Sequence, residues 1–307
     1  MWPELPKAWR RTYVTLHMWT QIVGKIALAR APPLNHSWGA ALQLTARGLS
    51  TRPLPHGSRT FTVELDFIEH RLVIAVSDRS QRVIPLSARS VAQLYREIMA
   101  ALHELNLPVH IWTMPVEVPS PVRFEHDTAH ASYDREQVDR FWQILLACER
   151  VFSEARCEFI GKASPVHFFW GSFDLAVSRF SGRPAPPRDG PAFMQESYSH
   201  EVISHGFWPG GGEGTAFGPG AVEEPVFYAY CVPPPPGFET MAVEPAAAFY
   251  QKDFAEFMLP YAAVRGASDP DGALRAFVES TYSRAADLAH WDRRALERPA
   301  SSVAARR

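Results

Sequence analysis

Histidines and carboxylates recur along this chain at nearly equal separations. Each half contains a histidine, then an acidic residue about 30 positions later, then a second histidine four positions after the acid. The two sets are His36, Asp66 and His70 in the first half, and His167, Glu196 and His200 in the second half. Two imidazoles and one carboxylate on one side of a metal ion leave positions for substrate and oxygen, as in non-haem Fe(II) oxygenases. A similar set holds zinc in hydrolases.

The second set is the first choice for a metal site. We expect His167, Glu196 and His200 to hold Fe(II), with zinc as the alternative metal and the first-half set as the second choice. Tyr198 and Glu201 flank His200 in ESYSHEV. They are therefore the candidate catalytic residues beside the metal.

Basic and aromatic residues near the second set are candidates for binding the substrate. Trp170 follows His167 closely, and Lys162 and Arg183 lie on either side of the same strand-rich block. Lys162 and Arg183, with Lys25 and Arg52 at the corresponding places of the first half, carry charges that suit an anionic group of a substrate.

The four-residue interval between acid and histidine is a geometric difficulty. Along a straight strand such residues lie about 13 Å apart, too far for one ion, whereas a helix or a bulge brings them closer. LDFIEHRL resembles a strand that ends in a turn. With 12 histidines in the chain, several are also expected to have purely structural partners.

The two strand-rich blocks resemble each other. VGKIALARAPPLNHSWGAALQLTARGLSTRPLP and IGKASPVHFFWGSFDLAVSRFSGRPAPP each contain Gly-Lys, a proline, a histidine, Trp-Gly, an alternating stretch and Arg-Pro. We interpret them as an internal duplication. The predicted halves are residues 1–130 and 131–307, packed as one globular unit.

Helices and strands alternate without the regular order of a parallel sheet. Helical spacing of apolar residues and capping signals predict helices from Ser90, from Asp134 and from Asp269, with two more near 8–29 and 245–258. Strands are predicted over 60–67, 72–76, 167–179 and 226–232. We expect an α+β fold in which each half is a mostly antiparallel sheet flanked by helices.

The composition restricts the class of protein. The 307 residues are 46% apolar and carry a formal net charge of −2, which gives no support for binding nucleic acid. No apolar run is long enough to span a membrane, and the first residues do not resemble a secretory signal. Three cysteines without close spacing predict free thiols. A cytoplasmic protein is expected, and its oligomeric state is left open.

Several strings resemble one bacterial family. WPELP, LHMWTQIVGK, NHSW, SPVHFFWGSFDLAVSRFSGR, YSHEV and GFWPGGG are similar to those of a family of about 300-residue proteins of unknown function, over most of the chain. The resemblance implies a single full-length family. It carries over no activity and no catalytic residue.

Three functions remain as expectations. The first is a mononuclear non-haem iron oxygenase acting on a small polar or aromatic molecule, with the glycine-rich segment 206–220 closing over the ligand. The second is a metal-dependent hydrolase or isomerase, with zinc as the metal. The third is a non-catalytic protein that binds a small molecule and whose histidines are structural.

Overall fold

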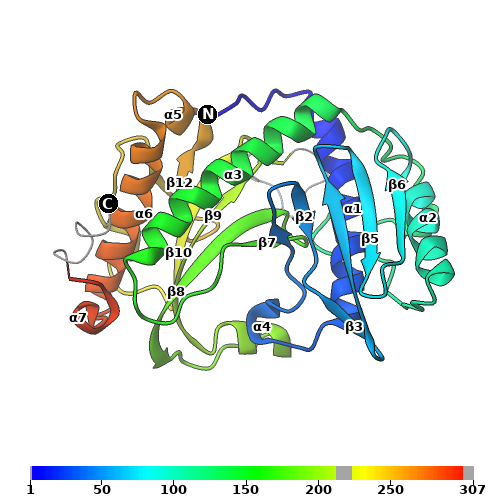
Figure 1. The fold of residues 1–307 in the computed structure, drawn as a ribbon. Helices are drawn as coiled ribbons and strands as arrows, with labels where there is room; N and C mark the ends of the chain where they lie inside the picture. Colours follow the sequence, from blue (N-terminus) through cyan, green and yellow to red (C-terminus); the bar gives the residue numbers. More distant parts are fainter. Residues whose placement is uncertain (1, 212–222, 300–307) are drawn as a thin grey trace.

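Two six-stranded antiparallel sheets form the framework of the protein (Figure 1). A computed structural model describes residues 2–211 and 223–299. The first sheet has the order β1-β2-β4-β5-β6, with β3 also paired to β4. Its strands are β1 Gln43–Leu44, β2 Gly48–Ser50, β3 Leu54–His56, β4 Arg59–Asp66, β5 Arg71–Val76 and β6 Gln81–Pro85. The predicted α+β class is confirmed.

The second sheet has the order β11-β12-β10-β9-β8-β7. Its strands are β7 His167–Phe169, β8 Asp174–Pro184, β9 His200–Trp208, β10 Val226–Val232, β11 Phe249–Gln251 and β12 Glu256–Pro260. The helices are α1 Trp9–Arg30, α2 Val91–Glu104, α3 Arg135–Cys157, α4 Ala192–Ser197, α5 Tyr261–Arg265, α6 Pro270–Leu288 and α7 Arg293–Leu296. The 3₁₀ turns are η1 Asn35–Ser37, η2 Phe124–His126 and η3 Phe238–Thr240.

Side-chain caps start the three best-marked helices. Ser90 accepts a hydrogen bond from the Gln93 backbone at the start of α2, and Asp134 and Asp269 cap α3 and α6 in the same way. These caps satisfy backbone N–H groups that have no partner within the helix. The predicted starts of the three helices are thereby confirmed.

The helix predicted over 245–258 is wrong. That stretch contains β11, a turn and β12, and β12 pairs with β10 through Phe257 opposite Ala229. Alanines and spaced aromatics suit a helix locally, but pairing with the sheet provides the backbone hydrogen bonds and buries Phe257. The strand predicted over 167–179 is likewise divided, because a turn at 170–173 separates β7 from β8.

Each half repeats the order helix, antiparallel sheet, helix, yet the residue-by-residue overlay does not describe the folded chain. The stretch after Trp38 forms β1, a turn and β2, whereas the stretch after Trp170 forms the single long strand β8. The sheets meet where Leu42 and Phe168 exchange two backbone hydrogen bonds of 2.9 Å.

One hydrophobic core extends through both halves. Helix α1 is buried at every position from Leu16 to Ala27, as expected for a helix surrounded by protein. Trp2 joins the same core by packing against Phe227 and Tyr261. Cys148, Cys157 and Cys231 are free thiols, as predicted. Among the described residues, no helix is long and apolar enough to cross a membrane.

Candidate functional site

The second sheet has one face covered by helices and one face rich in polar groups. His205 and Arg179 lie on the covered face, where His205 is 2.9 Å from the Thr281 hydroxyl of α6 and Arg179 stacks over Tyr282. Successive strand residues point to opposite faces. Residues that pair directly across neighbouring strands share a face, so the strand pairing identifies the side chains on the opposite face. We call it the polar face. It carries His167, Asp174, Ser178, Ser204, Tyr228, Tyr230 and Glu256.

Rings from both halves meet at one edge of the polar face. His36 of η1 stacks on Trp38 with 5.7 Å between ring centroids, and Trp38 lies 6.2 Å from His167 of β7. His36 is also 5.7 Å from Tyr198, which follows α4. Phe169 and Phe180 contact the same rings. These six residues form what we call the histidine–aromatic cluster.

His167 is the unusual member of the cluster. Its side chain is 1% exposed, and neither Nδ1 nor Nε2 has a hydrogen-bond partner within the described part of the chain. Burial is the main reason that the pKa of His167 is lowered to about 4, and the charges of Arg52, His36 and Arg156 act in the same direction. Burial also lowers the pKa of His36, whose buried Nδ1 has no partner either. Both imidazoles are therefore neutral at pH 7.

A row of tyrosines extends from the cluster along the polar face. The hydroxyls of Tyr198 and Tyr230 are 3.3 Å apart, and the rings of Tyr230 and Tyr228 stack with centroids 6.1 Å apart. Tyr228 donates a hydrogen bond to Asp174. A Cβ on Gly206 would lie 2.2 Å from the Tyr228 ring, so glycine is needed there for the ring to lie flat on the sheet.

Three carboxyl groups lie along this row: Asp174 and Glu117 at its Tyr228 end, and Glu256 next to Phe257 and so level with Tyr230. Burial raises the pKa of Asp174, although Ser172 and Tyr228 donate hydrogen bonds to it. Burial and then the charge of Asp174 raise the pKa of Glu256 to about 8 and that of Glu117 to about 7. The Glu117 carboxylate lies against Gly171, where an added Cβ would come within 2.8 Å of it. Groups with such pKa values exchange protons near neutral pH.

The structure does not bring the second metal set together. His167 is in register with Ala176 and, through it, with Gly206, whereas His200 lies six residues earlier on β9. This separates the two histidines by about 20 Å along the strand direction. Glu196 is exposed on α4, and His200 is exposed. Among the described residues, no group of three or more His, Cys, Asp or Glu side chains could hold a metal ion.

The first metal set has structural partners instead. Asp66 is 1% exposed and accepts hydrogen bonds from Arg47 and Arg71 and from two backbone N–H groups in the turn after β4. His70 is the last residue of that turn, and its Nδ1 is 2.9 Å from the Tyr133 hydroxyl. The sequence predicts this turn, and the Asp66 carboxylate stabilises it by accepting hydrogen bonds from its backbone. Only His36 of this set reaches the polar face.

Of the other predicted site residues, one lies in the cluster and the rest have other partners or are exposed. Tyr198 belongs to the cluster, whereas Glu201 pairs with Arg183, which also binds backbone carbonyls after α6. Trp170 donates to the Ala40 carbonyl. Lys162 is exposed outside the cluster. The glycine-rich segment falls largely on residues 212–222, outside the described residues.

The sequence interpretation missed Asp174, Tyr228, Tyr230 and Glu256. The alternation in VFYAYCV indicates that both tyrosines share one face of a strand. The signal available in the sequence was the recurrence of two polar rings on one face of a strand that lies next to buried strands. No short motif marks Asp174 or Glu256, which reach the same face from β8 and β12.

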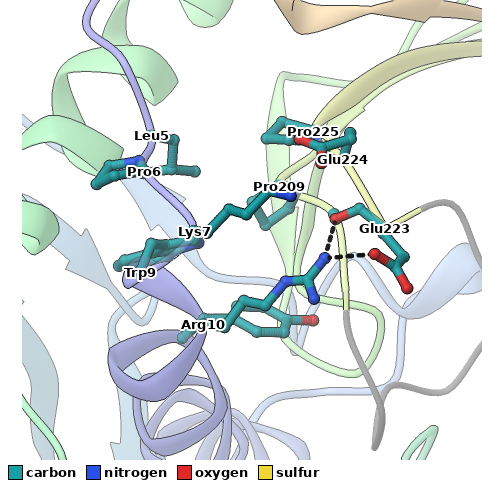
Figure 2. Close-up of a pocket in the computed structure, with 11 residues that line it drawn as sticks. Leu5, Pro6, Lys7, Trp9, Arg10, Pro209, Glu223, Glu224 and Pro225 are labelled. Carbon is teal, nitrogen blue, oxygen red and sulfur yellow. Dashed lines mark hydrogen bonds and ion pairs between the residues drawn. The ribbon is translucent and has the colours of Figure 1, made fainter.

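A pocket lies between the start of α1, the end of β9 and the start of β10 (Figure 2). Tyr13 is among its lining residues. Lys7 extends across it toward Pro209, and Arg10 pairs with Glu223. The charge of Asp174 contributes to the raised pKa of Tyr13. The pocket thus lies close to Asp174.

The fold defines an α+β protein with two antiparallel sheets and a polar face on the second one. Residues 2–298 match the family of unknown function DUF5996, and the chain belongs to that family. The full-length resemblance predicted from the sequence is confirmed. Neither a curated protein nor a solved structure matches this chain.

Proposed function

We propose that the protein binds a small organic molecule on the polar face of the second sheet, at the histidine–aromatic cluster. One observation carries the proposal: His167 is buried among rings, and neither of its nitrogens has a partner in the part of the chain that the structure describes. A buried polar group without a partner costs free energy, so such groups are rare and call for an explanation. A ligand that hydrogen-bonds to the imidazole supplies one.

The surroundings of His167 suit a molecule with a flat apolar part. Trp38, Phe169 and Phe180 provide ring faces and edges around the two histidines. Small-molecule sites are characteristically apolar and aromatic with a few convergent polar groups. Tyr198, Tyr230 and Tyr228 extend the same surface and are partly exposed, so the molecule reaches the cluster from the tyrosine side.

Acid–base catalysis on the bound molecule is the second candidate function. It is favoured by Glu256, which with a pKa of about 8 is mostly protonated at pH 7, and by Asp174, whose charge contributes to that raised pKa. An acid with this pKa donates a proton efficiently at neutral pH. The predicted residues of such an enzyme are Glu256 as the acid and Tyr228 as the group that orients Asp174.

Iron-dependent oxygenation remains a prediction from the sequence. The polar face offers two histidines from the two predicted sets, His36 and His167, without a third ligand from the described residues. Metal analysis of anaerobically purified protein tests it directly. Near-stoichiometric iron that is lost in His167→Ala would favour the oxygenase over the metal-free proposal.

Titration with benzyl alcohol, a neutral aromatic probe, tests the binding function. Binding is followed through the histidine ring signals in ¹H–¹³C NMR spectra and through the melting temperature. We expect the His36 and His167 signals to shift, and His167→Gln to weaken binding several-fold. His200→Gln is the matched control, because His200 is exposed and lies six residues along β9 from the position level with His167. Equal binding to both variants would contradict the proposal.

A further inference from the structure

Two arginines whose charges act on His167 form no ion pair within the described part of the chain. Arg52 follows β2 and Arg156 lies in the last turn of α3. The buried Nε of each has no hydrogen-bond partner, and neither side chain forms an ion pair with another described residue. Both charges are felt at His167, since both lower the pKa of its imidazole. The cluster therefore lies in a positive field.

Two other arginines of the chain each pair with a carboxylate. Arg47 pairs with Asp66, and Arg183 pairs with Glu201 and also binds two carbonyl groups. In each case a carboxylate compensates the guanidinium. Among the described residues, no carboxylate contributes to the pKa shift of His167 or His36.

The pairing of the strands explains how Arg52 comes close to His167. Phe168 pairs with Leu42, and β1 pairs with β2, so the strand carrying His167 is continued by the first sheet. Gln43 is opposite Ser50, and Arg52 lies two residues further on, on the same side as Ser50. The first half thereby contributes a cation to a site whose histidine comes from the second half.

We propose that this end of the site holds an oxyanion, the carboxylate or phosphoryl group of a small organic molecule, between Arg52 and His167. The inference rests on the proposed binding function and names the class of ligand. Guanidinium groups bind oxyanions through strong charge-assisted hydrogen bonds. A neutral imidazole adds one N–H donor. The apolar part of the molecule then lies against the rings of the cluster.

Four probes test this class of ligand: benzoate, phenyl phosphate, benzyl alcohol and inorganic phosphate. Each is titrated into the full-length protein while the histidine ring signals are followed. We expect benzoate or phenyl phosphate to bind about tenfold or more tightly than benzyl alcohol, because a charge-assisted hydrogen bond is added. Comparing benzoate, phenyl phosphate and inorganic phosphate separates a carboxylate, a phosphoryl ester and a free phosphate as the bound group.

Arg52→Gln is the decisive variant. It should remove about tenfold of the affinity for the anionic probe and leave the affinity for benzyl alcohol unchanged, whereas Arg52→Lys should retain part of the preference. Lys162→Gln is the matched control, since it removes an exposed positive charge outside the cluster. Melting temperatures of all three variants establish that they are folded.

The outcomes separate the two proposals. Benzyl alcohol binding as tightly as benzoate and phenyl phosphate, or an anion preference that survives Arg52→Gln, overturns the oxyanion site and leaves the binding function standing. If none of the aromatic probes shifts the signals of His36 or His167, the binding function fails and the oxyanion site fails with it.

Discussion

His167 acquires its chemical character from tertiary neighbours. In the sequence it lies next to Phe168 and Phe169, which predict only a buried strand. In the fold, the Trp38 ring from the other half lies beside it. The charges of His36 and Arg52, also from the other half, lower the pKa of its imidazole. The result is a neutral, buried imidazole without a partner among the described residues, and the binding role that we propose rests on that environment rather than on the spacing of histidines.

Glu256 provides a prediction at the scale of a single residue. Its pKa is raised to about 8, mainly by burial, so the folded protein holds this proton more tightly than the unfolded chain. Stability therefore falls as pH rises from about 4.5 to about 8. Glu256→Gln should remove this loss, becoming more stable than the wild type at pH 9 by on the order of 1–2 kcal/mol after allowance for partial exposure.

Urea unfolding at pH 5, 7 and 9 measures the effect. Glu69→Gln is the control, since Glu69 is exposed on the turn after β4. The urea midpoint of Glu256→Gln should rise above that of the wild type as the pH increases. The midpoint of Glu69→Gln should stay parallel to that of the wild type. Parallel curves for that variant and the wild type would show that Glu256 titrates normally.

At the scale of elements, close packing between α1 and the turn after β7 fixes the position of the cluster. Gly24 lies on α1 directly under Trp170, and a Cβ there would come within 2.2 Å of the indole. The Trp170 indole N–H binds the Ala40 carbonyl, between Trp38 and β1. Trp170, predicted to touch substrate, instead joins three segments that carry the site.

Gly24→Ala tests this packing. Alanine favours a helix by about 1 kcal/mol over glycine, but a clash with a packed ring costs typically 1–3 kcal/mol. We expect the clash to dominate, with a net loss of about 1–2 kcal/mol in the free energy of unfolding. Chemical denaturation measures it.

The double variant Gly24→Ala/Trp170→Ala isolates the contact. With the ring removed, adding the Gly24 methyl should no longer destabilise the protein and should be neutral or stabilising. If Gly24→Ala costs the same with and without Trp170, the contact is not the cause.

At the scale of the whole molecule, the first residues hold the second half. Trp2 donates a hydrogen bond of 2.8 Å to Asp271 of α6, and Tyr261 donates to the Pro3 carbonyl. Together with buried α1, these contacts place residues from the start of the chain against the second sheet. The second sheet is thus packed against residues from both halves.

Trp2→Ala should therefore destabilise the entire protein. Removing a largely buried indole from its contacts with Phe227 and Tyr261 costs about 3 kcal/mol, which a thermal or urea transition detects. Phe193→Ala is the control, because Phe193 is 60% exposed and its loss should be nearly neutral. A Trp2 variant with wild-type stability would mean that the first residues are not part of the core.

The sequence by itself determined the elements that local signals control. Ser90, Asp134 and Asp269 mark helix starts because a capping side chain acts within three residues. Strict alternation determined β4 for a similar reason. The antiparallel α+β class and the full-length family followed from these local patterns and strings.

Only the tertiary structure decided which residues meet. Strand register separates His167 from His200, and Arg47 and Arg71 engage Asp66, so equal spacing in the chain did not become equal geometry. Register and long-range pairing are also what bring His36, Arg52 and Tyr198 to His167. Such contacts depend on the free energy of packing distant segments together, which no interval between residues encodes.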